Sequence, residues 1–136
     1  MAKILLAEDE VNIASFIERG LKEFGHSVTV CHDGNTGWRI LQEEPFDLVI
    51  LDIIMPKMDG LTVMEQCSHD QTVKKLPSFI VVSAVGQERI TEDAFDLGAD
   101  YFMLKPFDNK MLLNRIKHIR RAGERRAREM NRPRQK

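Results

Sequence analysis

Hydrophobic residues along this chain alternate between short strand-like runs and stripes in which apolar positions recur every three or four residues. The short runs are KILLA at 3–7, SVTVC at 27–31, DLVIL at 47–51, FIVV at 79–82 and YFML at 101–104. Runs of aliphatic and β-branched residues are typical of strands. DLVIL is unbroken after its first residue, which is typical of a strand covered on both faces, so we expect it at the centre of a sheet.

The stripes between these runs predict five amphipathic helices. In the first, Val11, Ile17 and Leu21 share one face, and Gly25 ends the helix. Other helix limits are marked by breaking or capping residues: Pro45 ends the second helix, the third runs from about 61 to 68, Gly98 ends the fourth, and Asp108 caps the last. Five strand–helix units joined by right-handed crossovers predict an α/β fold, in which helices cover both faces of a parallel sheet.

Polar residues stand at the carboxyl ends of four of the predicted strands. They are Glu8 and Asp9, Asp52, Ser83 and Lys105. Ligands of open α/β sheets bind in the crevice outside the carboxyl ends of the strands, so we expect these side chains to share one pocket. Clustered carboxylates repel one another unless a cation joins them, and Mg²⁺ prefers oxygen ligands of this kind. The pattern therefore predicts a pocket for a divalent metal and a phosphoryl group.

Length and composition are those of one ordinary domain. The chain has 136 residues, of which 43% are hydrophobic, enough for a single packed core. No apolar stretch approaches the ~18 residues of a membrane span, and the N-terminus lacks the order of a signal peptide, so we expect a cytoplasmic protein. Cys31 and Cys67 have neither CxxC nor zinc-ligand spacing, and the four histidines form no metal-binding pair. We therefore expect the cysteines to be small, partly buried apolar groups.

Charge is divided between an acidic body and a basic C-terminal tail. The net charge is −1, yet residues 120–136 contain eight Lys or Arg and only two Glu. The tail at 121–136 is either a helix extension, since Arg, Ala and Glu are good helix formers, or a solvated linker. Its arginines could alternatively contact a partner or nucleic-acid phosphates. With no aromatic residue after Phe107 and no second helical module, we expect no sequence-specific nucleic acid binding by this chain alone.

Four segments in this order and spacing closely resemble the receiver domain of bacterial two-component response regulators: LLAEDE, LVILDIIMPKMDG, VVSAVGQ and YFMLKPF. The resemblance covers roughly residues 2–120. Residues 48–108 are most similar to receivers of the sporulation-initiating transcription factor type, and residues 1–46 to the winged-helix regulator subfamily. The resemblance implies a receiver domain at 1–120 with a flavodoxin-like (CheY-like) doubly wound five-stranded parallel sheet, strand order 2-1-3-4-5, and five helices.

The resemblance also assigns roles at the predicted pocket. Asp52 matches the phosphoacceptor, which takes a phosphoryl group from a sensor histidine kinase or a phosphotransfer protein. Glu8 and Asp9 match the acidic pair that holds Mg²⁺, for which Mn²⁺ can substitute. Asp9 would be a direct ligand and Glu8 would act through water, together with Asp52 and the backbone carbonyl of Ile54. Such a protein is a signalling protein that assists its own phosphorylation and dephosphorylation, rather than a conventional enzyme.

Further matched positions belong to a conformational switch. Lys105 matches the base that pairs with the phosphoryl oxygens, Ser83 the hydroxyl that turns toward them, and Phe102 the aromatic switch. The resemblance implies a cis bond between Lys105 and Pro106. It also suggests a homodimer through the last two helices and the strand between them, in a chain that is either a single-domain regulator or the regulatory part of a transcription factor.

Two apolar positions depart from receivers that lose their phosphate quickly. Those receivers tend to carry polar groups two residues after the phosphoacceptor and two after the hydroxyl, where this chain has Ile54 and Val85. Apolar side chains there are expected to obstruct an attacking water, which predicts a long-lived phosphoaspartate.

Simpler interpretations remain open for each residue taken alone. An acidic pair before a helix often only complements the helix dipole, and Asp52 or Lys105 could be an ordinary loop residue. A phosphorylation-independent interaction module, a degenerate receiver, is the main alternative. A flavodoxin-like redox protein is disfavoured because no phosphate-binding glycine loop exists. An aspartyl phosphatase is disfavoured because Ile54 replaces the second Asp of its DxD motif.

Overall fold

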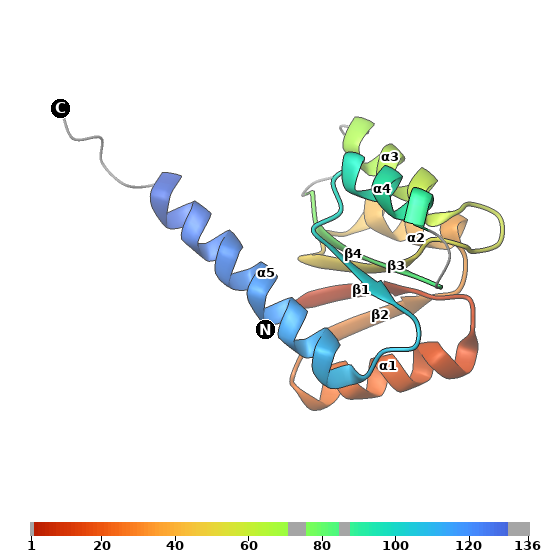
Figure 1. The fold of residues 1–136 in the computed structure, drawn as a ribbon, viewed down its shortest axis with the longest axis horizontal. Coiled ribbons are helices and arrows are strands. Elements are labelled where there is room, and N and C mark those ends of the chain that lie inside the picture. Colours follow the sequence, from red (N-terminus) through yellow and green to blue (C-terminus); the bar gives the residue numbers. More distant parts are fainter. Residues whose placement is uncertain (1, 71–75, 85–87, 131–136) are drawn as a thin grey trace.

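Five strands and five helices alternate along the chain, as the hydrophobic pattern predicts (Figure 1). The computed structural model describes residues 2–70, 76–84 and 88–130. The strands are β1 (Lys3–Ala7), β2 (Ser27–Cys31), β3 (Leu48–Asp52), β4 (Ser78–Ser83) and β5 (Tyr101–Leu104). The helices are α1 (Val11–Glu23), α2 (Gly34–Glu43), α3 (Gly60–His69), α4 (Glu88–Asp96) and α5 (Asn109–Met130).

The strands form one parallel sheet in the order β2-β1-β3-β4-β5, which confirms the predicted doubly wound topology. The central position expected for the DLVIL segment is confirmed, because β3 pairs with both β1 and β4 and all five of its residues are buried. The strand begins one residue later than predicted and includes Asp52. Asp52 is thus held in place by the pairing of β3 with β4, where it lies opposite Val82.

Alternate strand residues divide the core into two clusters, one on each face of the sheet. Leu5 and Val49 belong to the cluster that contains buried residues of α2, α3 and α4, whereas Ile4 and Ile50 belong to the cluster with α1 and α5. Figure 1 shows the same two helix layers on opposite sides of the sheet. Burial on both faces explains why the central runs contain no internal polar residue.

Both cysteines lie in the first of these clusters as free thiols, which confirms their expected apolar role, and they are more deeply buried than predicted. Burial raises the pKa of Cys31 and of Cys67 to about 12, so both stay protonated at neutral pH. They therefore behave as apolar side chains.

The helix limits follow from the predicted local signals. Gly25 and Gly98 follow α1 and α4 with φ angles of 87° and 106°, a backbone conformation that glycine adopts without a steric penalty. Asp108 caps α5, since its Oδ1 accepts the Met111 N–H at 2.8 Å. Among the described helices, none is long and apolar enough to cross a membrane.

Helix α5 continues well past the sheet (Figure 1). The buried side chains in the part of α5 whose burial is described, 109–121, are Leu112, Ile116 and Ile119, which pack against the α1 side of the core. Beyond them the backbone stays helical to Met130, through Gly123, so the first part of the basic tail is a helix extension. Residues 131–136 lie outside the described part of the chain.

Candidate functional site

The carboxyl edge of the sheet brings the predicted polar residues into one place. Glu8 and Asp9 follow β1, Asp52 and Ser83 are the last residues of β3 and β4, and Lys105 follows β5. Neighbouring strands are parallel and end nearly level with one another, so their terminal side chains meet at the same edge. The convergence expected from the sequence is thus present in the structure.

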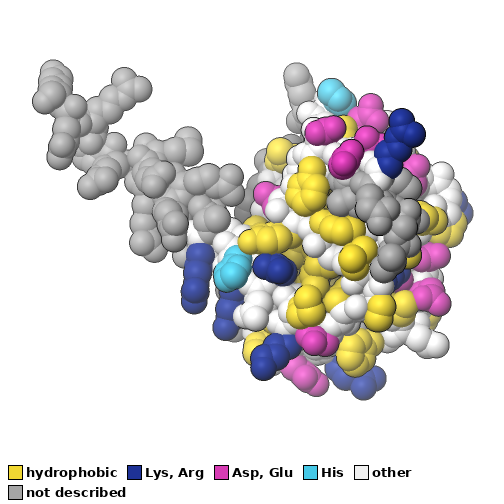
Figure 2. Space-filling model, in the orientation of Figure 1, with side chains coloured by type: hydrophobic (Ala, Val, Ile, Leu, Met, Phe, Trp, Pro, Cys, Tyr) yellow, Lys and Arg dark blue, Asp and Glu magenta, His cyan; other side chains and the backbone are white. Residues whose placement is uncertain are grey.

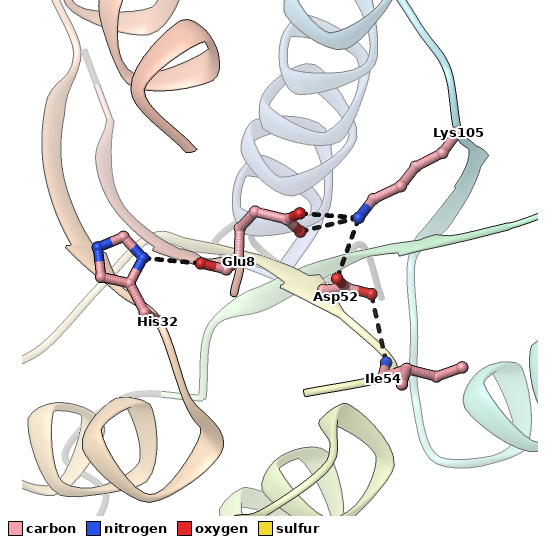
Figure 3. A network of polar contacts seen from close by, with 5 residues as sticks. All are labelled: Glu8, His32, Asp52, Ile54 and Lys105. Atoms are coloured by element: carbon pink, nitrogen blue, oxygen red, sulfur yellow. Dashed lines mark hydrogen bonds and ion pairs between the residues drawn. The ribbon is translucent and has the colours of Figure 1, made fainter. Parts of the chain in front are cut away.

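The Lys105 ammonium lies between two carboxylates (Figure 3). It donates to Glu8 Oε1 at 2.8 Å and Oε2 at 3.1 Å, and to Asp52 Oδ2 at 3.0 Å. The other oxygen of Asp52, Oδ1, accepts the backbone N–H of Ile54 at 3.2 Å. Both oxygens of Asp52 are therefore oriented by donors from two different segments of the chain.

Burial makes this pocket electrostatically unusual. Glu8 is 2% exposed and Asp52 is 6% exposed, so neither carboxylate is fully hydrated. Burial raises the pKa of Glu8 to about 7, helped by the nearby Asp52 and opposed by the hydrogen bonds from Lys105. Burial alone would lower the pKa of Lys105, but its hydrogen bonds to Glu8 and Asp52 raise it, so Lys105 keeps its positive charge.

The acidic residues are close enough to share a cation. One oxygen from each of Glu8, Asp9 and Asp52 lies within 4.8 Å of the others, and Asp9 is exposed. A set of carboxylate oxygens open to water on one side suits Mg²⁺, which retains several waters. The residues present therefore fit a magnesium ion.

Ser83 contributes a buried hydroxyl to the same edge. Its side chain is 2% exposed, and its Oγ has no hydrogen-bond partner among the described residues. Buried hydroxyls are nearly always hydrogen-bonded. An unpaired Oγ one strand away from Asp52 is suited to meet a polar ligand atom.

The loop after β3 is held against the start of α2. The Gly34 N–H donates to the Pro56 carbonyl at 3.4 Å, and the Met58 N–H donates to the same carbonyl at 2.8 Å. A Cβ on Gly34 would overlap the backbone carbonyl of Met58. Lys57, at a φ of 70°, lies at the turn between Pro56 and Met58. This close approach fixes the segment that carries Ile54.

His32 was not predicted as a site residue. It follows β2, and its Nδ1–H donates to the backbone carbonyl of Glu8 at 2.9 Å (Figure 3). The only sequence signal is its place directly after a strand. His32 therefore helps to hold the β1 end of the pocket.

The structure describes the remaining predicted residues except one. The side chain of Ile54 is 57% exposed at the rim. Phe102 is half-buried and packs against the core cluster on the α2–α4 side. The bond between Lys105 and Pro106 is cis. Val85 lies outside the described residues.

Solved structures share this fold. The receiver domain of the Francisella response regulator 1452 is 25% identical with a TM-score of 0.81, covering 90% of this chain and 99% of that one. Chemotaxis response regulator CheY4 of Vibrio cholerae is 24% identical with a TM-score of 0.79, covering 88% and 98%. NtrX from Brucella abortus is 24% identical with a TM-score of 0.82, covering 96% of this chain and 29% of that one. The last two likenesses concern the fold alone.

Sequence comparison identifies the family. Response regulator ArlR of Staphylococcus saprophyticus is 35% identical over 121 residues, which is 89% of this chain and 53% of that relative. The chain thus spans about half the length of this curated relative. The family model of the response regulator receiver domain matches residues 4–117. The chain belongs to the response regulator receiver domain family.

Proposed function

We propose that Asp52 accepts a phosphoryl group from a phosphohistidine of a sensor histidine kinase or phosphotransfer protein, in a reaction that requires Mg²⁺. One observation carries the proposal. The Asp52 carboxylate is buried, oriented by Lys105 and the Ile54 N–H, and lies beside an acidic pair. This is the arrangement that a phosphoryl transfer needs, because such a reaction depends on positioning and charge neutralisation.

In the proposed reaction a carboxylate oxygen of Asp52 forms a bond to phosphorus while the phosphorus–nitrogen bond to the donor histidine breaks. The electron pair of that bond returns to the imidazole, which leaves as a neutral ring once it takes up a proton. Lys105, already 3.0 Å from Asp52, pairs with a phosphoryl oxygen. Mg²⁺, held by Asp9, Asp52 and the Ile54 carbonyl and through water by Glu8, would supply further charge neutralisation.

The new phosphoryl group then shifts the conformation of the domain. The unpaired hydroxyl of Ser83 donates to a phosphoryl oxygen, and the half-buried ring of Phe102 moves inward. Both changes favour one state of a pre-existing equilibrium on the face formed by α4, β5 and α5. The low exposure of Ser83 supports this role, because bulk water has little access to the hydroxyl.

The same face is the proposed homodimer surface. It carries three large apolar side chains that are about half exposed: Phe95 on α4, Leu104 on β5 and Met111 on α5. We further propose that the protein acts in the cytoplasm, consistent with its two free thiols, as a single-domain regulator or as the regulatory part of a transcription factor, without sequence-specific nucleic acid binding of its own.

Incubation with acetyl phosphate and Mg²⁺, followed by intact mass spectrometry, tests the proposal. We expect a gain of one phosphoryl group that is labile to hydroxylamine, that needs the metal, and that is lost in Asp52→Asn. The absence of any gain in a folded sample would instead favour the phosphorylation-independent interaction module.

A further inference from the structure

A groove lies at the edge of the sheet opposite to Asp52. It runs between α5 and the turn that joins α1 to β2, and its cavity volume is about 560 Å³. The turn lies at the amino ends of the strands, because the Ser27 N–H donates to the Ala2 carbonyl at 3.0 Å. We call this feature the α5 groove. It is separate from the phosphoacceptor pocket, and its role does not depend on the proposed function.

The floor of the α5 groove is apolar. It contains Phe24 from the end of α1, and Leu113 and Ile116 from α5. Ile116 is buried in the core, Leu113 is half-buried, and Phe24 is 62% exposed. A large exposed aromatic ring beside anchored aliphatic groups is typical of a contact site for an apolar side chain.

The wall of the groove is cationic. Four of the lining residues carry a positive charge: Lys110, Lys117, Arg120 and Arg121. No ion pair joins any of the four to a described side chain, whereas other lysines of the chain, such as Lys22 and Lys3, have carboxylate partners. Figure 2 shows Lys and Arg side chains gathered where α5 leaves the body. The body itself therefore does not neutralise this charge.

His26 adds a further donor to the groove. Its Nδ1 accepts the backbone N–H of Ala2 at 3.1 Å, so the hydrogen of the neutral ring is on Nε2. Partial burial and the nearby Arg120 lower the pKa of His26, which favours this neutral form. Apart from the amide oxygen of Asn114, the polar side chains of the groove offer donors only, so they match an acceptor-rich ligand.

We propose that the α5 groove binds an acidic amphipathic segment of a partner protein, with carboxylates on the α5 cations and an apolar side chain against Phe24. The combination of cationic wall and apolar floor favours a protein segment over nucleic acid, whose backbone would use the cations but not the aliphatic floor. The volume accommodates several side chains and is larger than a single phosphate requires. The groove lies at the opposite edge of the sheet from Asp52, so a ligand bound there would not cover the Asp52 pocket.

A peptide titration followed by amide chemical shifts of the full chain tests the proposal. The probe is a synthetic helical peptide with Leu along one face and Glu on the other. We expect shifts confined to the Phe24–Ser27 turn and to α5. Binding should weaken about tenfold or more in Lys117→Ala/Arg120→Ala, since two charge pairs are lost. It should weaken about fivefold in Phe24→Ala, which removes an aromatic anchor.

A matched control separates the groove from general charge. Arg19→Ala/Lys22→Ala also removes two positive charges, from an α1 surface that does not line the groove, and should leave the affinity within about twofold. The amide spectrum of each variant reports whether it is folded.

Four results would overturn the proposal. They are the absence of shifts with the acidic peptide, equal binding of a peptide with Ser in place of Leu, tighter binding of a DNA duplex at the same amides, and concentration-dependent shifts of these amides without any peptide. The last would make the groove an interface between copies of this chain.

Discussion

Protonation of Glu8 should compete with magnesium, because the folded chain buries this carboxylate beside Asp52. Its pKa of about 7 means that Glu8 is largely protonated in mildly acidic solution, although Lys105 donates to both of its oxygens. An acid must lose its proton before it can serve a metal, directly or through water. Lowering the pH from about 8 to about 6 should therefore weaken Mg²⁺ binding as Glu8 takes up its proton.

The size of the effect follows from the pKa. A single proton that competes at about 7 leaves the apparent dissociation constant nearly unchanged at about pH 8 and raises it about tenfold at about pH 6. In Glu8→Gln the affinity should be lower at about pH 8 but almost independent of pH over the same range. In the metal-free chain the raised pKa of Glu8 makes the folded state more stable at low pH, whereas it makes Mg²⁺ binding weaker there. Protonated Glu8 stabilises the native state, fully below its unperturbed value of 4.5, and this stabilisation is lost as the pH rises through about 7.

Magnesium titrations monitored by the amide shifts around Asp52, at several pH values, provide the measurement. Urea unfolding of the metal-free protein and of Glu8→Gln at the same pH values checks the predicted pH dependence of the free energy of unfolding. The reasoning would be refuted by a wild-type affinity that stays constant from about pH 8 to about pH 6, or by an equal pH dependence in Glu8→Gln.

Three further predictions concern the proposed metal ligand Asp9, the stability of the phosphorylated state and the packing of Gly34. Asp9→Asn should weaken Mg²⁺ binding by at least about tenfold and slow phosphorylation with it, and an unchanged affinity in a metal titration would remove Asp9 from the ligand set. Ile54→Asn combined with Val85→Glu should speed loss of the phosphoryl group about tenfold, measured as the decay of the phosphorylated mass over time. A wild-type half-life of seconds would contradict the proposed long-lived state. Gly34→Ala should lower the free energy of unfolding by about 1–3 kcal/mol, because the new Cβ meets the backbone of the β3–α3 loop. The exposed neighbour serves as its control in urea unfolding, since Asn35→Ala should cost far less.

The sheet and the position of its site could be predicted because both depend on local signals. Apolar runs buried on two faces mark the strands, and the polar residue that ends each run must lie at the carboxyl edge once the strands are parallel. Asp52, Ser83 and Lys105 were located in this way. The likeness to the sporulation-type subfamily stays a prediction.

The different surroundings of Glu8 and Asp9 could not be predicted from the sequence. The two are neighbours at the end of β1, yet Glu8 is buried against Lys105 and Asp9 is exposed. Glu8 turns inward toward Lys105, which follows β5 and is almost a hundred residues away in the chain. The α5 groove was missed for a similar reason, since it depends on how α5 passes the end of α1.

The length of α5 has a mechanical consequence for any signal that the domain produces. Among the side chains whose burial is described, Ile119 is the last buried apolar one of α5, and the helix continues to Met130, about 16 Å further at the rise of an α-helix. The projecting part of the helix moves with the packed part, so a rotation of α5 about the edge of the core displaces its far end. A tilt of about 10° at the anchored half would displace the far end by about 3 Å. A small rearrangement beside the sheet is in this way enlarged into a movement that another molecule can sense.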